Sequence, residues 1–135
     1  QKISAIIGLA PAPDFPKILI WDKMIGDEKR KLVKNRKISI KYEDGSKNNF
    51  SYKLIKDSFK NLTLSKSIPF NGPVYLYHGM ADDAVPYDLS IKIVNTFKGT
   101  NDIKLLLERD AGRRLSDIYQ LKTITNIIEK IKIKI

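Results

Sequence analysis

The chain has 135 residues, of which 42% are hydrophobic and 30% are charged, and it contains no cysteine. This length and composition predict one soluble globular domain and exclude disulfides and thiolate metal sites. No apolar run approaches the roughly 20 residues that a membrane-spanning helix needs, and no secretory signal is recognisable. We therefore expect a cytoplasmic protein that does not act at a membrane.

The charge balance is strongly basic, with 25 Lys and Arg against 15 Asp and Glu and a net charge of +10. The basic residues are spread along the chain, and the one dense cluster comprises Lys29, Arg30, Lys31, Lys34, Arg36 and Lys37. No aromatic stacking platform or nucleic-acid motif accompanies it, and a helical charge run usually forms a solvated face. We do not expect nucleic-acid binding, although a non-catalytic basic binding module remains an alternative.

The first element predicted is a strand at residues 3–10, an almost continuous apolar run that ends at Pro11 and Pro13. Such a run is typical of a parallel strand buried on both faces, and here nothing before it covers one of its edges. Residues 15–68 are different in character. Segments of helical periodicity lie on either side of a hairpin with an Asp44-Gly45 turn, which predicts a small inserted cap.

Two further buried strands are predicted at residues 74–78 and 103–108, each followed by a helix. The first helix starts near Pro86 and ends before Gly99, and the second has Ser116 as its N-cap and an apolar stripe that reaches Ile131. Alternating strands and helices form right-handed βαβ units. We therefore expect an α/β fold with about three parallel strands flanked by helices.

Chemistry in such a sheet lies beyond the carboxyl ends of the strands. The loop His78-Gly79-Met80-Ala81-Asp82-Asp83-Ala84-Val85-Pro86 follows one predicted strand, and the loop at residues 110–117 follows the next. With Gly8 to Phe15, these segments resemble the C-terminal part of α/β-hydrolases, especially serine esterases and palmitoyl-protein thioesterase-like members. The resemblance covers nearly the whole chain. It implies hydrolysis of an acyl ester or thioester, and it places the acid of the catalytic triad at Asp82.

The second loop departs from the family's Gly-His-Arg-Leu-Ser, because this chain has Gly112-Arg113-Arg114-Leu115-Ser116. Arg113 thus occupies the position of the triad histidine, and a guanidinium stays protonated and cannot act as the base. We expect it to form an ion pair with Asp82.

The nucleophile is also absent, since the sequence has no Gly-x-Ser-x-Gly elbow and no Gly-rich oxyanion loop. We expect a C-terminal hydrolase fragment that is inactive alone. It would take a small acyl ester or thioester only when completed by an N-terminal half, as in a two-chain hydrolase. The bare edge of the first strand is the expected joint, and it could also mediate self-association.

The only histidine, His78, directly precedes the acid loop. We expect it to support that loop, because as the base it would have to come from the same turn as the acid. A metal site built from His78, Asp82 and Asp83 is an alternative, but three ligands within six residues rarely enclose an ion unaided. No metal and no cofactor are expected.

Overall fold

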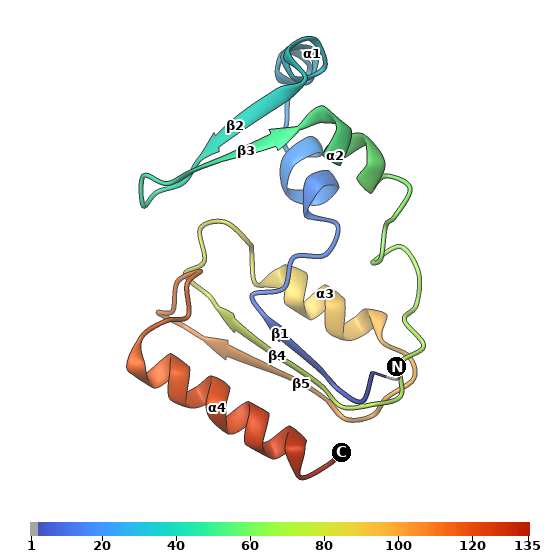
Figure 1. The fold of residues 1–135 in the computed structure, drawn as a ribbon, viewed down its shortest axis with the longest axis vertical. Helices are drawn as coiled ribbons and strands as arrows, with labels where there is room; N and C mark the ends of the chain where they lie inside the picture. Colours follow the sequence, from blue (N-terminus) through green and yellow to red (C-terminus); the bar gives the residue numbers. More distant parts are fainter. Residues whose placement is uncertain (1–2) are drawn as a thin grey trace. The chain divides into compact units, whose positions relative to one another are not determined.

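The computed structural model describes residues 3–135 and divides the chain into two compact units (Figure 1). Of the described residues, 3–12 and 66–135 form the core unit and 13–65 form the inserted unit. Each unit is described separately below.

The core unit is built on a three-stranded parallel sheet in the order β1-β4-β5. The strands are β1 (Ile6–Leu9), β4 (Val74–Gly79) and β5 (Ile103–Glu108), and every residue of the central strand β4 is buried. The predicted parallel sheet is therefore confirmed. β1 is shorter than the predicted residues 3–10, and Ile3 is 71% exposed.

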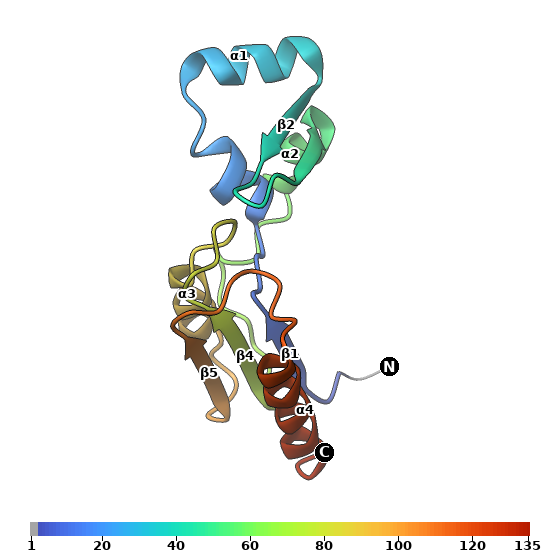
Figure 2. The same cartoon turned by 90° about the vertical axis from the view of Figure 1, so that its left-hand side faces the viewer.

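Helices cover both faces of this sheet, with α3 (Asp88–Thr96) on one face and α4 (Ile118–Lys132) on the other (Figure 2). Leu89 and Ile93 are buried on the side of α3 that faces the sheet. On the α4 side, Tyr77 packs among residues of the loop after β5 and of α4, namely Ala111, Leu115, Ile124 and Ile127. Burial, together with the Glu108 carboxylate that accepts the phenol hydrogen bond, raises the pKa of Tyr77 above its usual range.

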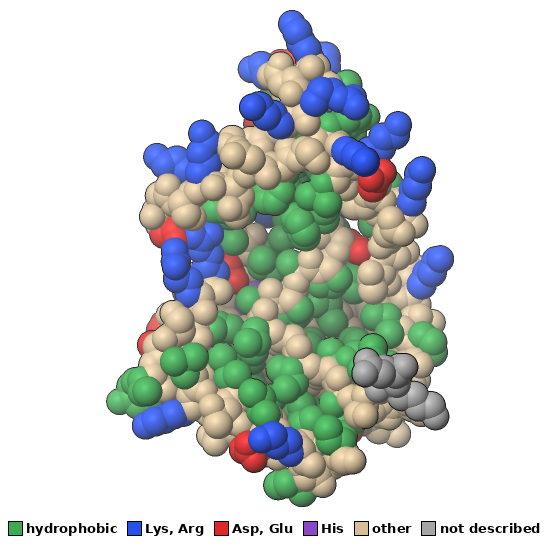
Figure 3. Space-filling model, in the orientation of Figure 1, with side chains coloured by type: hydrophobic (Ala, Val, Ile, Leu, Met, Phe, Trp, Pro, Cys, Tyr) green, Lys and Arg blue, Asp and Glu red, His purple; other side chains and the backbone are tan. Residues whose placement is uncertain are grey.

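The sheet has an open edge at β1, which pairs with β4 on one side and with no other strand of the described residues. Ile7 and Leu9 are 38% and 45% exposed. They lie on the α4 face of the sheet, because Leu9 pairs in parallel register with Tyr77, which packs against α4, and Ile7 is two residues before Leu9 in the strand. On α4, Tyr119 and Leu121 are also exposed. Figure 3 shows apolar side chains gathered over the part of the core unit that β1 and α4 occupy in Figure 1.

The inserted unit contains a π-helical segment, two α-helices and a two-stranded antiparallel sheet. Its small core is formed by Ile20, Met24, Leu32 and Ile55. In chain order its elements are η1 (Pro16–Trp21), α1 (Gly26–Asn35), β2 (Lys37–Lys41), β3 (Lys47–Ser51) and α2 (Tyr52–Ser58). The hairpin turn lies at the predicted Asp44-Gly45, where Gly45 has φ +79°.

The two ends of the inserted unit are tied together by Asp14. Its Oδ1 accepts a hydrogen bond from the backbone N–H of Thr63, and its Oδ2 accepts one from that of Leu64, both at 2.8 Å. Asp14 adopts φ +60°, a left-handed conformation that Asp tolerates better than most residues. One carboxylate thereby closes a chain segment of about 50 residues.

The basic cluster lies on α1 and the start of β2, where most of its side chains, such as Lys31 and Lys34, are exposed. Lys29 lies over the Trp21 ring, with its Nζ 5.0 Å from the ring centroid. Within residues 3–135, no helix has the length and apolar character needed to cross a membrane.

Candidate functional site

The two loops singled out by the sequence meet at the carboxyl end of the sheet. Because β4 and β5 are parallel, their exits lie at the same edge. The backbone N–H of Met80 donates to the Glu108 carbonyl at 2.8 Å, and that of Ala81 donates to the Ala111 carbonyl at 3.0 Å. The loop that carries Asp82 is thus joined directly to the loop that carries Arg113.

Gly79 permits this close contact between the loops. A Cβ added at Gly79 would lie 2.1 Å from the Ala111 carbonyl oxygen, far inside van der Waals contact. The obstacle is backbone, so a side chain at this position would force the two loops apart.

We therefore expect Gly79→Ala to destabilise the chain by about 1–3 kcal/mol, the usual cost of overpacking. The measurement is thermal unfolding followed by circular dichroism. Gly26→Ala is the matched control, because no heavy atom lies within 4 Å of a Cβ added there. Equal melting temperatures for the two variants would contradict the close approach of the loops.

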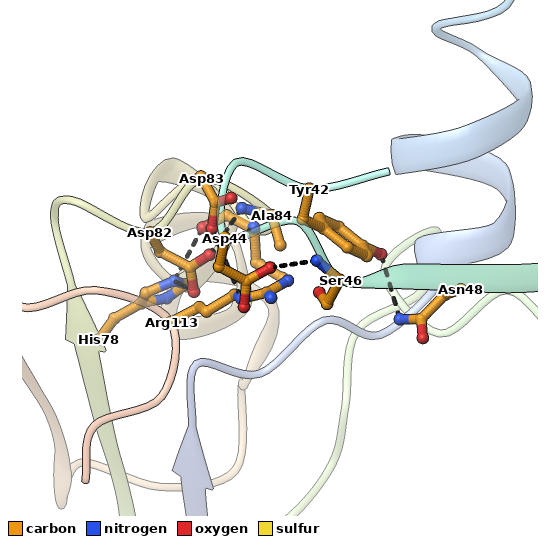
Figure 4. Close-up of polar contacts among 10 residues, drawn as sticks. Tyr42, Asp44, Ser46, Asn48, His78, Asp82, Asp83, Ala84 and Arg113 are labelled. Atoms are coloured by element: carbon orange, nitrogen blue, oxygen red, sulfur yellow. Dashed lines mark hydrogen bonds and ion pairs between the residues drawn. The ribbon is translucent and has the colours of Figure 1, made fainter. Parts of the chain in front are cut away.

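The Asp82 side chain is 1% exposed and is held on one side only. Its Oδ1 accepts hydrogen bonds from the backbone N–H groups of Ala84 and Val85, both at 2.8 Å. Figure 4 shows Asp82 and Ala84 in this loop, together with His78 and Arg113. Among the residues that the structure describes, Oδ2 is buried and has no hydrogen-bond partner. A buried carboxylate oxygen without a donor is costly, so Oδ2 is suited to accept a hydrogen bond from another group.

Arg113 lies against the same loop, but its ion pair is with Asp83. Arg113 Nε is 3.7 Å from Asp83 Oδ1, and the two side chains are 20% and 19% exposed. The partner differs from the predicted Asp82, because the Asp82 carboxylate turns inward to cap its own loop while the side chain of Asp83 is left nearer the surface. This guanidinium cannot accept a proton from a hydroxyl.

His78 is fully buried below this loop. Its Nδ1 lies 2.6 Å from Ser90 Oγ on α3, and its Nε2 lies 3.0 Å from the Val85 carbonyl oxygen and 3.5 Å from Asp82 Oδ2. The order Ser90, His78, Asp82 is that of a catalytic triad. Ser90, however, is 0% exposed, so a substrate cannot reach its hydroxyl. Ser90 carried no signal in the sequence, because only the packing of α3 on β4 brings it to His78.

A metal centre at these residues has no support in the geometry. Nowhere in residues 3–135 do three or more His, Cys, Asp or Glu side chains gather in a way that could hold a metal ion.

The chain resembles known proteins over nearly its whole length. A solved structure of a protein from Agrobacterium vitis S4, assigned as a hydrolase, superposes with a TM-score of 0.89 at 30% sequence identity, covering 96% of this chain and 50% of that one. The chain belongs to the α/β-hydrolase superfamily. It corresponds to the C-terminal portion of that fold. No protein-family model matches it.

Other proteins similar to this α/β-hydrolase-superfamily chain support the same assignment. Human palmitoyl-protein thioesterase ABHD10, a mitochondrial protein, is 30% identical over 97% of the chain. The structure of the mouse α/β-hydrolase domain-containing protein 10 shares the fold, with a TM-score of 0.82 at 22% identity over 96% of this chain and 54% of that one. The chain spans about half the length of the curated relatives it matches, 44% in the human case.

Proposed function

We propose that this chain is the acid-bearing half of a serine-hydrolase site for small acyl esters or thioesters, and that it does not hydrolyse them alone. The observation that carries the proposal is the buried Asp82 carboxylate at the carboxyl end of β4. Its Oδ1 accepts two backbone hydrogen bonds, and its Oδ2 has no hydrogen-bond partner among the described residues. A triad acid must accept one hydrogen bond from an imidazole, and an anchored carboxylate with one unused oxygen meets that need.

The nucleophile, the base and the oxyanion donors of such a site are not among the residues of this chain. Acyl transfer needs a hydroxyl nucleophile, a base that takes its proton, and donors for the oxyanion. Arg113, at the position of the family's histidine, can neutralise a carboxylate but cannot take the proton. The nucleophile and the oxyanion donors would come from an N-terminal half, whether joined to this chain or separate.

The open edge of β1 is the proposed joint with that half. A strand from the N-terminal half would pair with β1, and a helix beside it would cover Ile7 and Leu9. Without this cover, apolar surface stays exposed and the isolated chain should self-associate.

Co-expression tests the joint, with the part of the Agrobacterium vitis hydrolase that this chain does not cover as the probe. We expect the two polypeptides to co-purify, and either Ile7→Lys or Leu9→Lys to weaken the complex at least tenfold, because a lysine ammonium would have to be buried. Val33→Lys, at a 41% exposed position on α1, is the matched control. Failure to co-purify, or complexes unaffected by either β1 substitution, would contradict this proposal.

A further inference from the structure

Val85 stands between the acid carboxylate and the buried imidazole. Its N–H donates to Asp82 Oδ1 at 2.8 Å, and its carbonyl oxygen lies 3.0 Å from His78 Nε2. A carbonyl oxygen only accepts hydrogen bonds, so the hydrogen between these atoms must be carried by Nε2. The His78 imidazole therefore fixes the Val85 backbone, and the Val85 N–H in turn fixes the Asp82 carboxylate.

Ser90 completes the arrangement from α3. In a neutral imidazole with its proton on Nε2, Nδ1 is an acceptor, and Ser90 Oγ at 2.6 Å is placed to donate to it. His78 and Ser90 are both 0% exposed, so water cannot replace either hydrogen bond. The Val85 carbonyl therefore fixes the nitrogen that carries the proton, and the Ser90 hydroxyl fixes the orientation of the ring.

The same geometry explains why Asp82 Oδ2 accepts no hydrogen bond from His78. His78 Nε2 is 3.5 Å from Oδ2, too far for a good hydrogen bond, and its single proton is directed to Val85. We propose that His78 and Ser90 are positioning residues that fix Asp82 through Val85, so that Oδ2 is presented as an acceptor at the strand edge. This proposal rests on the proposed role of Asp82 as the acid.

The first test is made on the unmodified chain, by a long-range nitrogen–proton NMR spectrum of its single imidazole. We expect the signature of a neutral ring with the proton on Nε2. A proton on Nδ1 would overturn the proposal, whatever the outcome for the role of Asp82.

The second test compares Ser90→Ala with Thr96→Val, which removes a hydroxyl from the same helix, one that donates to the Lys92 carbonyl at 2.8 Å. The quantity measured is amide hydrogen exchange at Ala84 and Val85 relative to Leu76 in β4. We expect this ratio to rise about tenfold in Ser90→Ala and to stay unchanged in Thr96→Val, because only Ser90→Ala removes a buried hydrogen bond to His78. An unchanged ratio in Ser90→Ala would overturn the proposal.

A third readout separates positioning from general stability. In a chain that carries Arg113→His, Ser90→Ala should lower the pKa of the introduced imidazole, and Thr96→Val should not, because only Ser90 acts on the placement of Asp82. Equal effects of both substitutions would contradict positioning. If the amides of Ala84 and Val85 respond to Ser90→Ala but the introduced imidazole does not respond to Asp82→Asn, the positioning network stands and the acid role fails.

Discussion

Arg113→His should convert a weakly active chimera into a working hydrolase. The chimera joins this chain to the N-terminal half of an α/β-hydrolase chosen to carry the Gly-x-Ser-x-Gly elbow and its oxyanion loop. With Arg113 in place, the serine has no base, and only the weak turnover that comes from substrate binding and the oxyanion hole is expected, about 10³ to 10⁴-fold over water. The substitution should raise kcat on a short acyl thioester by about 10⁴-fold or more, because the loss of a triad base costs this much in serine hydrolases.

The controls for this gain lie in the acid loop. Asp82→Ala should abolish the activity of the Arg113→His chimera, because the imidazole loses the carboxylate that orients it. Asp83→Ala should reduce it far less, since the described contact of Asp83 with residue 113 is a partly exposed ion pair. The 135-residue chain by itself, with or without Arg113→His, should show no enzyme-like turnover. Hydrolysis by the unmodified chain that survives Asp82→Ala would contradict the assignment.

The sheet could be predicted closely because its strands are marked by composition. Residues 103–108 form β5 as predicted, and β4 ends at Gly79, one residue beyond the predicted 74–78. Both strands are rich in apolar residues and are bounded by Gly, Pro or polar residues. β4 is buried along its whole length, whereas β5, at an edge of the sheet, leaves Lys104 and Leu106 exposed. β1 is less well bounded, since the apolar run in the sequence begins before the ladder with β4 does.

Local competition between neighbouring polar residues was harder to predict. Ser116 is a good N-cap by residue type, but α4 is capped by Asp117, whose Oδ1 accepts from the N–H groups of Tyr119 and Gln120. The Gln120 side chain returns a hydrogen bond to the Asp117 backbone, which completes a capping box. Ser116 and Asp117 are adjacent and both suit an N-cap by residue type, and the structure places the cap at Asp117.

The candidate site could be predicted in position but not in its contacts. The motif places Asp82 and Arg113 on two loops, and the parallel sheet brings those loops together. That Asp82 turns inward, that Arg113 pairs with Asp83, and that Ser90 reaches His78 all depend on how α3 and the two loops pack. No spacing in the sequence encodes these contacts.

The most direct test of the acid assignment is the titration of the imidazole introduced by Arg113→His, measured by NMR on the chain without any nucleophile. If Asp82 Oδ2 accepts its hydrogen bond, the carboxylate favours the charged ring and raises its pKa above the ordinary value of about 6.5. Adding Asp82→Asn should remove most of that rise, and adding Asp83→Asn should remove little of it. A pKa at the ordinary value, or one that responds to Asp83→Asn and not to Asp82→Asn, would contradict the account of this chain as the acid-bearing half of a hydrolase site.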